Sequence, residues 1–454
     1  MTQDHPIQKL KNFFHLLQSV QANIRYGFPA RKLKIIGVTG TDGKTTTTAM
    51  IYHILKQSGL KVGYISTIDA KIGDKNLDTG LHVTTPDPWV IPRYLREMHK
   101  AGMEYVVIES TSSGLEQNRL WGVRFDSATI TNIKNDHLDY HGTWENYAES
   151  KFKLIEMIAG QGVGILNRDD DRSASWIKKR LGSSGRPEVD IVWYSKSDVS
   201  NLEESVGGIG FDYDKMHYNI PVIGEYNVEN ALAAINVTQK YLSPEKIASA
   251  LRTFPVPKGR MQVVKNNPFS VIVDFAHTSS SLERALSAVN KIKSPGGRTI
   301  CVFGCAGKRD KARRSMGEVS ARLADVTVLT SEDPRDEKLG DINDEIFDYA
   351  RKHKGKMIQR ISDHKKYLGK AMQAESHEKQ IDNLLAAGEK PFFAFDEDSI
   401  NSRQDAIDFA IQIAKPDDIV FITGKAHEQS MAFGDTEYPW SDHEAVKRAL
   451  DKSK

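Results

Sequence analysis

The chain has 454 residues, enough for about two or three domains, and 39% of them are hydrophobic and 27% are charged. The 62 basic and 60 acidic residues give a formal net charge of +2, so no bulk electrostatic attraction favours a nucleic-acid partner. Two cysteines, Cys301 and Cys305, cannot form a disulfide framework or a four-cysteine zinc site, and no run of about 18 apolar residues could span a membrane, so we expect a cytoplasmic protein.

Residues 1–30 carry a helical pattern of apolar side chains. The stripe consists of Ile7, Leu10, Phe13, Phe14, Leu17, Val20 and Ile24. Such a stripe ordinarily packs against the protein's own core, and this is what we expect here. The alternative is a helix that lies on a membrane surface, a peripheral contact that the nearby Lys9, Lys11 and Arg25 would favour.

Residues 31–257 alternate apolar, β-rich runs with amphipathic helical patterns. We expect a helix over Thr45–Gln57 and strands over Leu33–Val38, Tyr105–Ile108 and Ala128–Ile133. This alternation predicts an α/β domain with a mostly parallel sheet covered by helices. Residues 190–222 are β-rich with little helical pattern and indicate a small antiparallel flap.

A break in the pattern at residues 254–259, Phe-Pro-Val-Pro-Lys-Gly, predicts a linker before a second α/β domain over residues 258–454. The strands expected in this domain are Val271–Phe275, Thr299–Phe303, Val326–Leu329 and Ile419–Ile422. Residues 363–397 are rich in Glu, Lys and Gln, and we expect them to form a helical insertion on the surface.

The strongest local signal is a glycine-rich turn between the first strand and the helix that follows it. The turn and the start of the helix contain Gly40, Thr41, Asp42, Gly43, Lys44, Thr45 and Thr46. Glycines let backbone N–H groups converge on a phosphate, and the helix N-terminus adds partial positive charge. We therefore expect Lys44 to reach the β- and γ-phosphates of ATP and the Thr45 hydroxyl to bind Mg²⁺. The chain has Val38 where the common P-loop has its first glycine, and a plain turn before a helix is the alternative.

Polar side chains follow two of the expected strands. Glu109 ends one apolar run, and Asp136 and His137 follow another. A carboxylate and an imidazole beside a phosphate loop would suit Mg²⁺, because the carboxyl ends of parallel strands meet at one edge of a sheet. Each of these residues could equally be a loop residue or a helix cap.

Nine motifs occur in the order in which a known family has them. They are Gly-Val-Thr-Gly-Thr-Asp-Gly-Lys-Thr-Thr at 37–46, Thr-Thr-Pro at 84–86, Glu-Ser-Thr-Ser-Ser-Gly-Leu at 109–115, Asp-His-Leu-Asp-Tyr-His-Gly at 136–142, Gly-Glu-Tyr-Asn-Val-Glu-Asn at 224–230, Gly-Arg-Met at 259–261, Val-Asp-Phe-Ala-His at 273–277, Asp-Pro-Arg at 333–335 and Gly-Lys-Ala-His-Glu at 424–428. From residue 33 to the C-terminus the chain thus resembles the Mur ligase family, most closely its UDP-N-acetylmuramoyl-tripeptide synthetase branch. The resemblance implies a P-loop-containing central ATPase domain followed by a Rossmann-like C-terminal ligase domain.

The resemblance also implies a reaction and its cofactors. ATP phosphorylates a peptide carboxylate, and the amino group of the incoming amino acid attacks the acyl phosphate to form an amide. Two Mg²⁺ ions are implied. Lys44 and Thr45 would serve the phosphates and the first ion, and Glu109 and His137 would hold the second ion, with support from a carbamylated Lys151. Asn227 and Asn230 would lie near the adenine, and Arg260 and Asp274 would reach the phosphates and the ribose after domain closure.

Two further sets of residues match substrate positions of the family. The muramoyl-peptide would contact Thr84, Thr85, Ser112 and Arg119. The amino acid would contact Arg314, Asp333, Arg335, Gly424 and Glu428. An Asn-Pro-Arg loop in this branch accompanies meso-diaminopimelate, whose additional carboxylate a guanidinium can bind with paired hydrogen bonds. Here Asp333 replaces the asparagine, and meso-diaminopimelate is the amino acid that we expect.

The chain also departs from the family, and rival interpretations remain open. The family has a UDP-recognising domain before the phosphate loop, and about 30 residues are too few to form one. We therefore expect similar kcat/KM values for a UDP-linked acceptor and for the same muramoyl-dipeptide without UDP. A folylpolyglutamate- or cyanophycin-synthetase type of ligase is one alternative, and a non-catalytic, nucleotide-gated scaffold is another. We expect a monomer.

Overall fold

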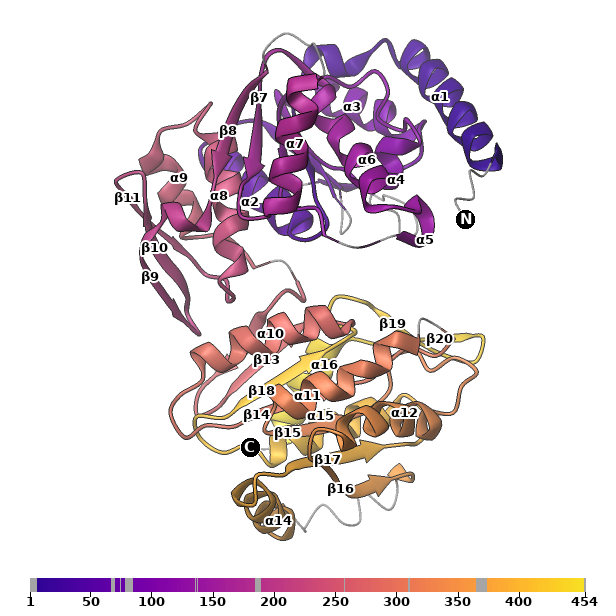
Figure 1. Ribbon diagram of the computed structural model, residues 1–454, viewed down its shortest axis with the longest axis vertical. Coiled ribbons are helices and arrows are strands. Elements are labelled where there is room, and N and C mark those ends of the chain that lie inside the picture. Colours follow the sequence, from indigo (N-terminus) through magenta and orange to yellow (C-terminus); the bar gives the residue numbers. More distant parts are fainter. Residues whose placement is uncertain are drawn as a thin grey trace. The chain divides into compact units, whose positions relative to one another are not determined.

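The computed structural model describes residues 6–452 except 67–69, 74, 78–84, 135, 137, 184–188, 257, 309–310 and 365–373. The chain forms two compact units, coloured from indigo to pink and from pink to yellow in Figure 1. Unit 1 comprises Met1–Glu203, Ile209–Pro221 and Glu225–Pro255, and unit 2 comprises Glu204–Gly208, Val222–Gly224 and Val256–Lys454.

An eight-stranded sheet forms the centre of unit 1. Its strands, in spatial order, are β4 (Lys75–Leu77), β3 (Ala70–Ile72), β2 (Val62–Ile65), β5 (Tyr105–Glu109), β1 (Lys34–Thr39), β6 (Phe125–Ile130), β7 (Ile158–Asn167) and β8 (Asp190–Tyr194). Neighbours from β2 to β8 run parallel, whereas β3 pairs antiparallel with both β2 and β4. The mostly parallel α/β architecture predicted for this part of the chain is therefore confirmed.

Helices cover this sheet on both faces. They are α1 (Pro6–Tyr26), α2 (Lys44–Gln57), α3 (Val90–Lys100), α4 (Ser112–Glu116), α5 (Leu138–His141), α6 (Trp144–Glu156), α7 (Asp171–Ser183), α8 (Tyr226–Thr238) and α9 (Pro244–Leu251), with short 3-10 turns at Pro29–Lys32 and Lys196–Asp198. Alternate strand residues such as Ile35 and Val106 share a buried cluster with Leu95 of α3 and Phe152 of α6. Helix α2 contacts β1, β2 and β5 of this sheet and also packs against α8 and α9.

The antiparallel flap predicted over residues 190–222 is present only from Ser200 onward, because Asp190–Tyr194 forms β8 of the large parallel sheet. It is a three-stranded sheet in the order β11 (Met216–Ile220), β10 (Gly208–Tyr213) and β9 (Ser200–Ser205). Strands β10 and β11 pair antiparallel, and Phe211 of β10 stacks on Tyr218 of β11 with ring centroids 5.7 Å apart.

Unit 2 is built on a seven-stranded sheet. Its spatial order is β12 (Gln262–Asn266), β13 (Ser270–Asp274), β18 (Ile419–Thr423), β14 (Thr299–Phe303), β15 (Val326–Leu329), β17 (Lys390–Phe395) and β16 (Gly355–Ile361), and a hairpin of β19 (Ser430–Phe433) and β20 (Thr436–Pro439) lies outside it. All neighbours are parallel except β12 and β13. Its helices are α10 (Ser279–Ile292), α11 (Met316–Leu323), α12 (Leu339–Arg351), α14 (Ala374–Ala386), α15 (Asn401–Gln412) and α16 (Asp442–Lys452), with a 3-10 turn at Lys311–Ser315.

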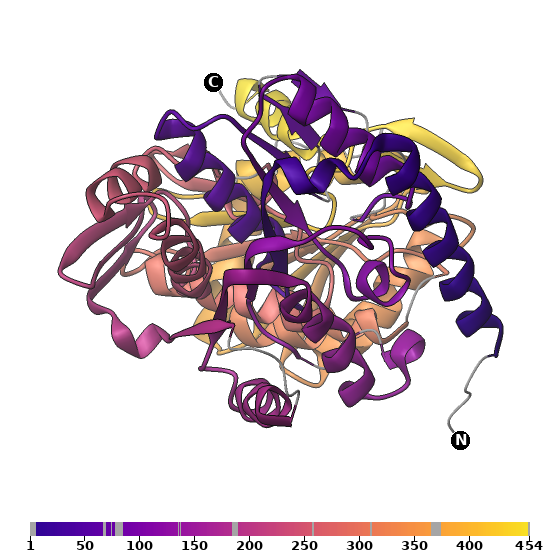
Figure 2. The same cartoon turned by 90° about the horizontal axis from the view of Figure 1, so that it is seen from above.

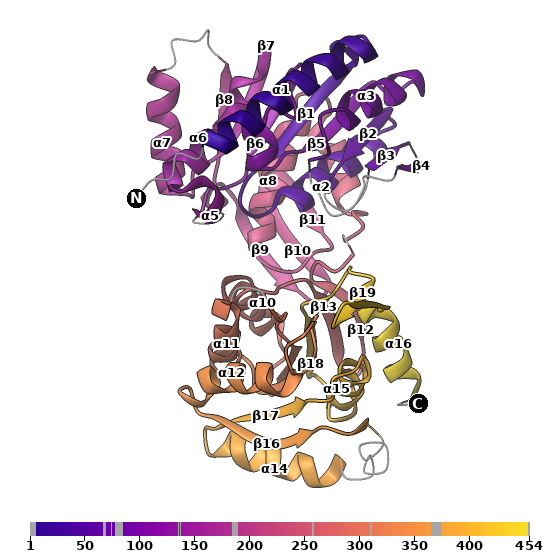
Figure 3. The ribbon, with the colours of Figure 1, turned by 90° about the vertical axis from the view of Figure 1, so that its right-hand side faces the viewer.

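The prediction for residues 363–397 was wrong in part. Helix α14 occurs there, but so does β17, which lies between β15 and β16 within the sheet. Figure 3 shows β17 beside β16. The run Pro-Phe-Phe-Ala-Phe at 391–395 is fully buried. The prediction overlooked these five residues because it was based on the charged composition of the whole segment. This segment is therefore part of the core and not only a surface insertion.

The expectation for α1 was also wrong. Its apolar stripe does not enter the core, because Leu10, Phe13, Phe14, Leu17 and Ile24 are exposed. The buried positions of the helix are Ser19, Ala22 and Asn23. In the part of the chain that the structure describes, no helix combines the length and the apolar character needed to cross a membrane.

Candidate active site

The glycine-rich turn connects the end of β1 to the first residue of α2, as predicted. Gly43 has φ of +80°, a left-handed conformation that favours glycine. A Cβ atom there would lie 2.0 Å from Oδ1 of Asn230, and one at Gly40 would lie 1.9 Å from Oγ1 of Thr131. The turn therefore needs glycine for close packing at both positions.

The predicted phosphate-binding residues lie at the start of α2. Lys44 Nζ donates to the carbonyl oxygens of Gly40 at 3.1 Å and of Thr41 at 2.9 Å. Thr45 Oγ1 donates to Glu109 Oε1 at 3.0 Å, so the end of β5 meets the start of α2. Thr46 follows on the same helix turn and is half-buried. The helix N-terminus, an ammonium group and a carboxylate thus surround one small region.

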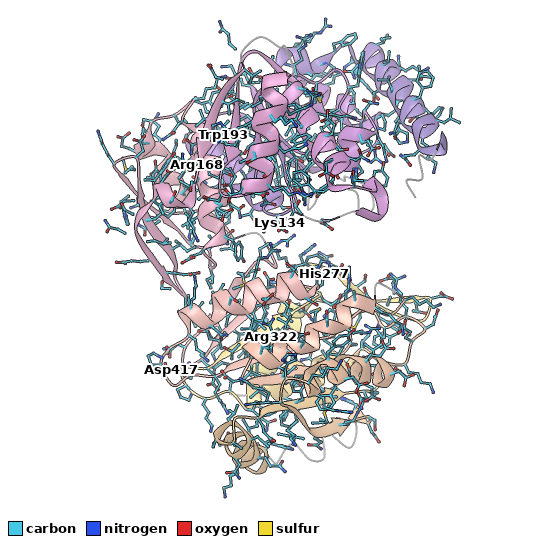
Figure 4. All side chains as sticks on the ribbon, viewed as in Figure 1. Lys134, Arg168, Trp193, His277, Arg322 and Asp417 are labelled. Atoms are coloured by element: carbon cyan, nitrogen blue, oxygen red, sulfur yellow. The ribbon has the colours of Figure 1, made fainter. Side chains whose placement is uncertain are left out.

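Residues that the sequence analysis missed hold the turn in place. Asp42 N–H donates to Asn132 Oδ1 at 2.9 Å, and Thr131 Oγ1 donates to the Asp42 carbonyl at 2.5 Å. The Tyr147 hydroxyl lies 3.2 Å from Thr41 Oγ1. Lys134, labelled in Figure 4, places its Nζ 3.3 Å from the Asp42 carboxylate. Their position in the sequence could have identified them. Residues 131–134 directly follow β6, at the edge of the sheet where β1 and β5 also end.

Lys151 is the most unusual charged residue near the turn. It lies on α6, is almost fully buried, and its Nζ donates to the Gly40 carbonyl at 2.6 Å, the same oxygen that Lys44 contacts. Burial lowers the pKa of Lys151 well below its usual value, and the neighbouring Lys44 charge lowers it further, against the opposing effect of Asp136. The structure therefore favours a neutral amine at this position.

The predicted metal ligands are placed in part. Glu109 is fully buried at the end of β5, beside Thr45. His137 and Thr84 lie outside the described residues. Within the described ranges, no group of three His, Cys, Asp or Glu side chains could hold a metal ion. The Thr45 hydroxyl and the Glu109 carboxylate are nevertheless hard oxygen donors, which is the chemistry that Mg²⁺ takes.

The two asparagines predicted near the adenine lie together on α8. Asn230 Nδ2 donates to Asn227 Oδ1 at 2.9 Å, and Thr47 Oγ1 donates to Asn230 Oδ1 at 3.4 Å. Both asparagines are buried, and Asn230 packs against Gly43. In this structure the pair joins α8 to the start of α2.

The described residues predicted to contact the muramoyl-peptide form a cluster near α4. Thr85 Oγ1 accepts from the Thr111 N–H at 2.9 Å, and Arg119 donates to the Thr85 carbonyl at 2.8 Å. Ser112 Oγ lies 3.0 Å from His141 Nε2, whose Nδ1 lies 3.1 Å from Glu116. The structure therefore brings Thr85, Ser112 and Arg119 together.

The Ser112 side chain is oriented by a relay that the sequence analysis did not identify. Burial opposes ionisation of Glu116, but the hydrogen bond and charge of His141 outweigh it and lower the pKa of Glu116. A carboxylate at Glu116 fixes the His141 ring, and the ring in turn fixes the Ser112 hydroxyl. The second histidine of the motif at 136–142 was the sequence feature that could have indicated this arrangement.

In unit 2, Arg260 and Asp274 lie close to each other. Asp274 accepts from the backbone N–H groups of Met261 at 2.7 Å and of Ala276 at 2.8 Å. Burial raises the pKa of Asp274, and Arg260 acts in the opposite direction. The Arg260 guanidinium lies 5.3 Å from the centroid of the Phe275 ring, which also packs on His277 (Figure 4).

The residues predicted to contact the amino acid meet around Lys425. Lys425 Nζ lies 2.8 Å from Asp333 Oδ1 and 2.5 Å from Glu428 Oε2. Asp333 and Arg335 both have positive φ, and the Arg335 backbone N–H donates to the Ala432 carbonyl at 3.2 Å. Arg335 Nε is buried and has no hydrogen-bond partner among the residues that the structure describes.

Arg314 differs from the other residues of this predicted set. Its guanidinium is buried and lies 3.1 Å from both Glu337 and Glu345, and it also donates to the Ala306 carbonyl at 3.2 Å. These three partners all belong to the protein. The Arg314 guanidinium is therefore paired within the protein and does not point toward a position where an amino acid could bind.

Glu332 is a buried carboxyl group that the sequence analysis missed. It follows β15 as Glu109 ends β5, and a Cβ at Gly424 would lie 2.9 Å from Glu332 Oε2. That oxygen has no hydrogen-bond partner within the described part of the chain. Burial raises the pKa of Glu332 from 4.5 to about 8, although Arg403 and Lys425 oppose the shift.

The titration of Glu332 predicts a pH-dependent stability. Between pH 4.5 and about 8 the folded state binds more protons than the unfolded state, so the free energy of unfolding falls as the pH rises through this window. Glu332→Gln removes the titrating group. The Tm of this variant should therefore rise relative to the wild-type Tm as the pH rises, by about 2–4 °C for each kcal/mol that the wild type loses in its free energy of unfolding. Scanning calorimetry below and above the window measures this, with the exposed Glu444→Gln as control. A constant Tm difference would contradict the prediction.

Comparisons with known proteins match both parts of the chain to one family. A model of the Mur ligase middle domain matches residues 38–238, and a model of the Mur ligase glutamate ligase domain matches residues 259–390. A UDP-N-acetylmuramyl-tripeptide synthetase of Roseiflexus sp. (strain RS-1) is 33% identical over 444 residues, which cover 94% of this chain and 80% of that protein. A UDP-N-acetylmuramoyl-L-alanyl-D-glutamate–2,6-diaminopimelate ligase of Aquifex aeolicus (strain VF5) is 34% identical over 434 residues, covering 94% and 79%. A solved structure of a ligase with that same name matches 93% of this chain and 79% of its own, with a TM-score of 0.64 and 27% identity.

Proposed function

The chain belongs to the Mur ligase family, and on this basis we propose that it is an ATP-dependent amide ligase that adds meso-diaminopimelate to a muramoyl-L-alanyl-D-glutamate precursor of peptidoglycan. The reaction forms ADP and phosphate. The observation that carries the proposal is the arrangement at the turn of unit 1, where Lys44, Lys151 and the Thr45–Glu109 pair surround the helix N-terminus. The names of the relatives support the identity of the two substrates.

The first step is transfer of the γ-phosphoryl group of ATP to the peptide carboxylate, which gives an acyl phosphate and ADP. Several anionic oxygens come together in this step, so the protein must offset their charge. The backbone N–H groups at the start of α2 and the Lys44 ammonium provide positive potential for the phosphates. Lys44 now donates to two carbonyl oxygens of its own turn, and these bonds can be exchanged for bonds to phosphate.

Mg²⁺ fits the donor set of this region. Thr45 and Glu109 would hold it through the hydroxyl and carboxylate oxygens that now bond to each other. When bound, the ion would neutralise phosphate charge. A carbamylated Lys151 is proposed as a further anionic group beside them.

The second step is attack of the amino group on the acyl carbon, after which phosphate leaves and an amide remains. We propose that unit 2 holds the amino acid through Arg335, Asp333, Gly424 and Glu428. Lys425 pairs with both Asp333 and Glu428, so the negative charge of Asp333 is already compensated. An aspartate at this position is thus compatible with a carboxylate ligand.

The proposal is tested by measuring ADP formation and the mass of the product with a panel of amino acids and acceptors. We expect ADP and a tripeptide product with meso-diaminopimelate and a muramoyl-L-alanyl-D-glutamate acceptor. Activity only with a folate or another unrelated acceptor would show that a different Mur-like ligase is present.

The choice of amino acid gives a separate prediction. Arg335→Ala should raise the apparent KM for diaminopimelate far more than the KM for lysine, because only diaminopimelate has a second carboxylate that would lose its guanidinium partner. The preference should fall by roughly tenfold or more. Steady-state kinetics with both amino acids measures it, and Arg322→Ala on α11 is the matched control because Arg322 pairs at the surface with Glu283. A wild-type preference for lysine would show that Arg335 has another role.

A further inference from the structure

Helix α1 is amphipathic in the opposite sense to an ordinary surface helix. The polar residues Ser19 and Asn23 are buried against the protein, whereas five large apolar residues face away from it. Figure 2 shows the helix along the outside of unit 1. The arrangement is set by the chemistry of the surface under the helix, which offers hydrogen-bonding groups.

Polar contacts hold the inner face of α1 to the α4 region. Ser19 Oγ donates to the Asn118 carbonyl at 2.8 Å, and Asn23 Nδ2 donates to the Trp121 carbonyl at 2.8 Å. Nearer the N-terminus, Gln8 Nε2 donates to the Tyr140 hydroxyl at 2.9 Å. The helix therefore cannot turn its apolar face inward without losing these bonds, two of which satisfy backbone carbonyls.

The outer face presents five large apolar side chains. Their exposed fractions are 69% for Leu10, 56% for Phe13, 58% for Phe14, 45% for Leu17 and 65% for Ile24. Leu10, Phe13, Phe14 and Leu17 recur at intervals of three and four residues and form one stripe, and Ile24 lies two turns further along the same face. Exposure of such a stripe to water is unfavourable, and a stripe of this kind marks a docking surface.

We propose that the outer face of α1 is a docking surface for a bilayer that contains anionic lipids. The charge of the helix points to this occupant, because its sequence from Pro6 to Tyr26 contains no Asp or Glu. Lys11 and Arg25 on the helix and Arg31 and Lys32 directly after it are all exposed. A helix with Phe and Leu on one face and basic residues at its flanks lies in the plane of the lipid headgroups.

A second copy of the chain fits this face less well. The five exposed side chains offer roughly 600 Å², at about 200 Å² for a large apolar side chain. A stable dimer ordinarily buries about 800 Å² on each partner. Two such faces would also bring basic residues together with no acidic residue on either helix to offset them.

The docking surface is connected to the acceptor-binding region through the inner face of the helix. Asn118 and Trp121, which accept hydrogen bonds from α1, belong to the segment that contains Arg119. A bilayer under α1 would thus lie near the loop proposed to contact the muramoyl-peptide, so the site would face substrates close to the membrane. Lipid binding itself does not depend on the ligase assignment and is tested apart from it.

The test is co-sedimentation of the full-length protein with vesicles. We expect binding to vesicles of phosphatidylglycerol and phosphatidylcholine in equal parts, weaker binding to phosphatidylcholine alone, and a decrease with added salt. The double variant Phe13→Glu/Phe14→Glu should lose at least about tenfold in affinity for the anionic vesicles. Its ligation rate in solution and its circular-dichroism melting curve should match those of the wild type.

The matched control places the same two charges elsewhere. Tyr349→Glu/Tyr438→Glu also replaces two exposed aromatic residues by glutamate, and it should bind the vesicles like the wild type. Equal losses in both variants would show that net charge alone governs binding and would overturn the proposal. The proposal would also fail if the wild type does not bind anionic vesicles, or if sedimentation equilibrium shows a dimer that only the Phe13/Phe14 variant disrupts.

Discussion

Replacement of Lys44 by alanine should reduce kcat for ATP-dependent ligation by about two orders of magnitude or more. Lys44 is the lysine of the turn at the start of α2, and its Nζ is placed over that turn by the carbonyls of Gly40 and Thr41. We expect the ammonium group to offset charge that grows during phosphoryl transfer when phosphates occupy the turn. An alanine cannot do so, and the backbone N–H groups alone would remain.

The fold should survive this substitution, which makes the result interpretable. Among the residues that the structure describes, Lys44 makes its two hydrogen bonds within its own turn, so its loss should leave the bonds between distant described elements intact. ADP release gives the rate, calorimetric titration gives ATP affinity, and thermal melting checks the fold. Lys56→Ala, at the other end of the same helix, is the matched control and should keep wild-type turnover. Near-normal turnover of Lys44→Ala would show that the turn does not serve phosphoryl transfer.

The sequence predicted most of the architecture because its strands are short apolar runs with clear ends. The strands at Thr299–Phe303 and Val326–Leu329 were predicted to the residue, and α2 begins one residue before its predicted start and ends where predicted. The strand expected at Ala128–Ile133 begins and ends three residues earlier. Thr131 still donates its backbone N–H to the Thr39 carbonyl of β1, but its side chain and that of Asn132 bond to Asp42 of the glycine-rich turn.

What the sequence did not predict depends on contacts between distant residues. Periodicity identified the apolar stripe of α1, but not that Ser19 and Asn23 would find carbonyl partners and turn the stripe outward. The strand β17 was missed because burial on both faces allows a plain apolar run with no alternation. The protonation of Glu332 follows from burial, which no local pattern in the sequence reveals.

Replacement of Lys151 by alanine should also leave the enzyme nearly inactive, with a loss of at least about a hundredfold in kcat. The Nζ atoms of Lys44 and Lys151 both donate to the same oxygen, the Gly40 carbonyl. Two ammonium groups that bond to the same oxygen lie close together and repel each other in a buried site. Loss of the Lys151 proton relieves this repulsion, which agrees with the lowered pKa of Lys151.

A neutral amine is the form that reacts with CO₂. Its nitrogen forms a bond to the carbon of CO₂, one N–H proton passes to solvent, and a carbamate with a single negative charge results. The remaining N–H can keep the bond to the Gly40 carbonyl. The new charge is opposite to that of Lys44, so an unfavourable pair of lysines becomes a favourable ion pair beside the Thr45–Glu109 donors.

The direction of the pKa shift of Lys151 predicts how stability and carbamylation depend on pH. With a pKa for Lys151 lower in the folded state than in the unfolded state, unfolding takes up protons between the two values, so stability rises with pH in that window. Carbamylation should likewise increase with pH and with dissolved CO₂. Activity after CO₂ depletion should fall and should return when bicarbonate is added.

Four variants separate carbamylation from a purely structural role of Lys151. Lys151→Ala should be partly rescued by short carboxylates that fill the vacant position, whereas Lys151→Arg keeps a cation, cannot form the carbamate and should stay inactive. Lys151→Glu should recover part of the activity because it supplies a carboxylate, and Lys153→Ala on the same helix is the control. A carbamate carbon resonance from ¹³C-bicarbonate should appear in the wild type and be absent from all three Lys151 variants. An unmodified Lys151 in fully active enzyme would refute the carbamate, because the buried lysine would then act only by supporting the Gly40 turn.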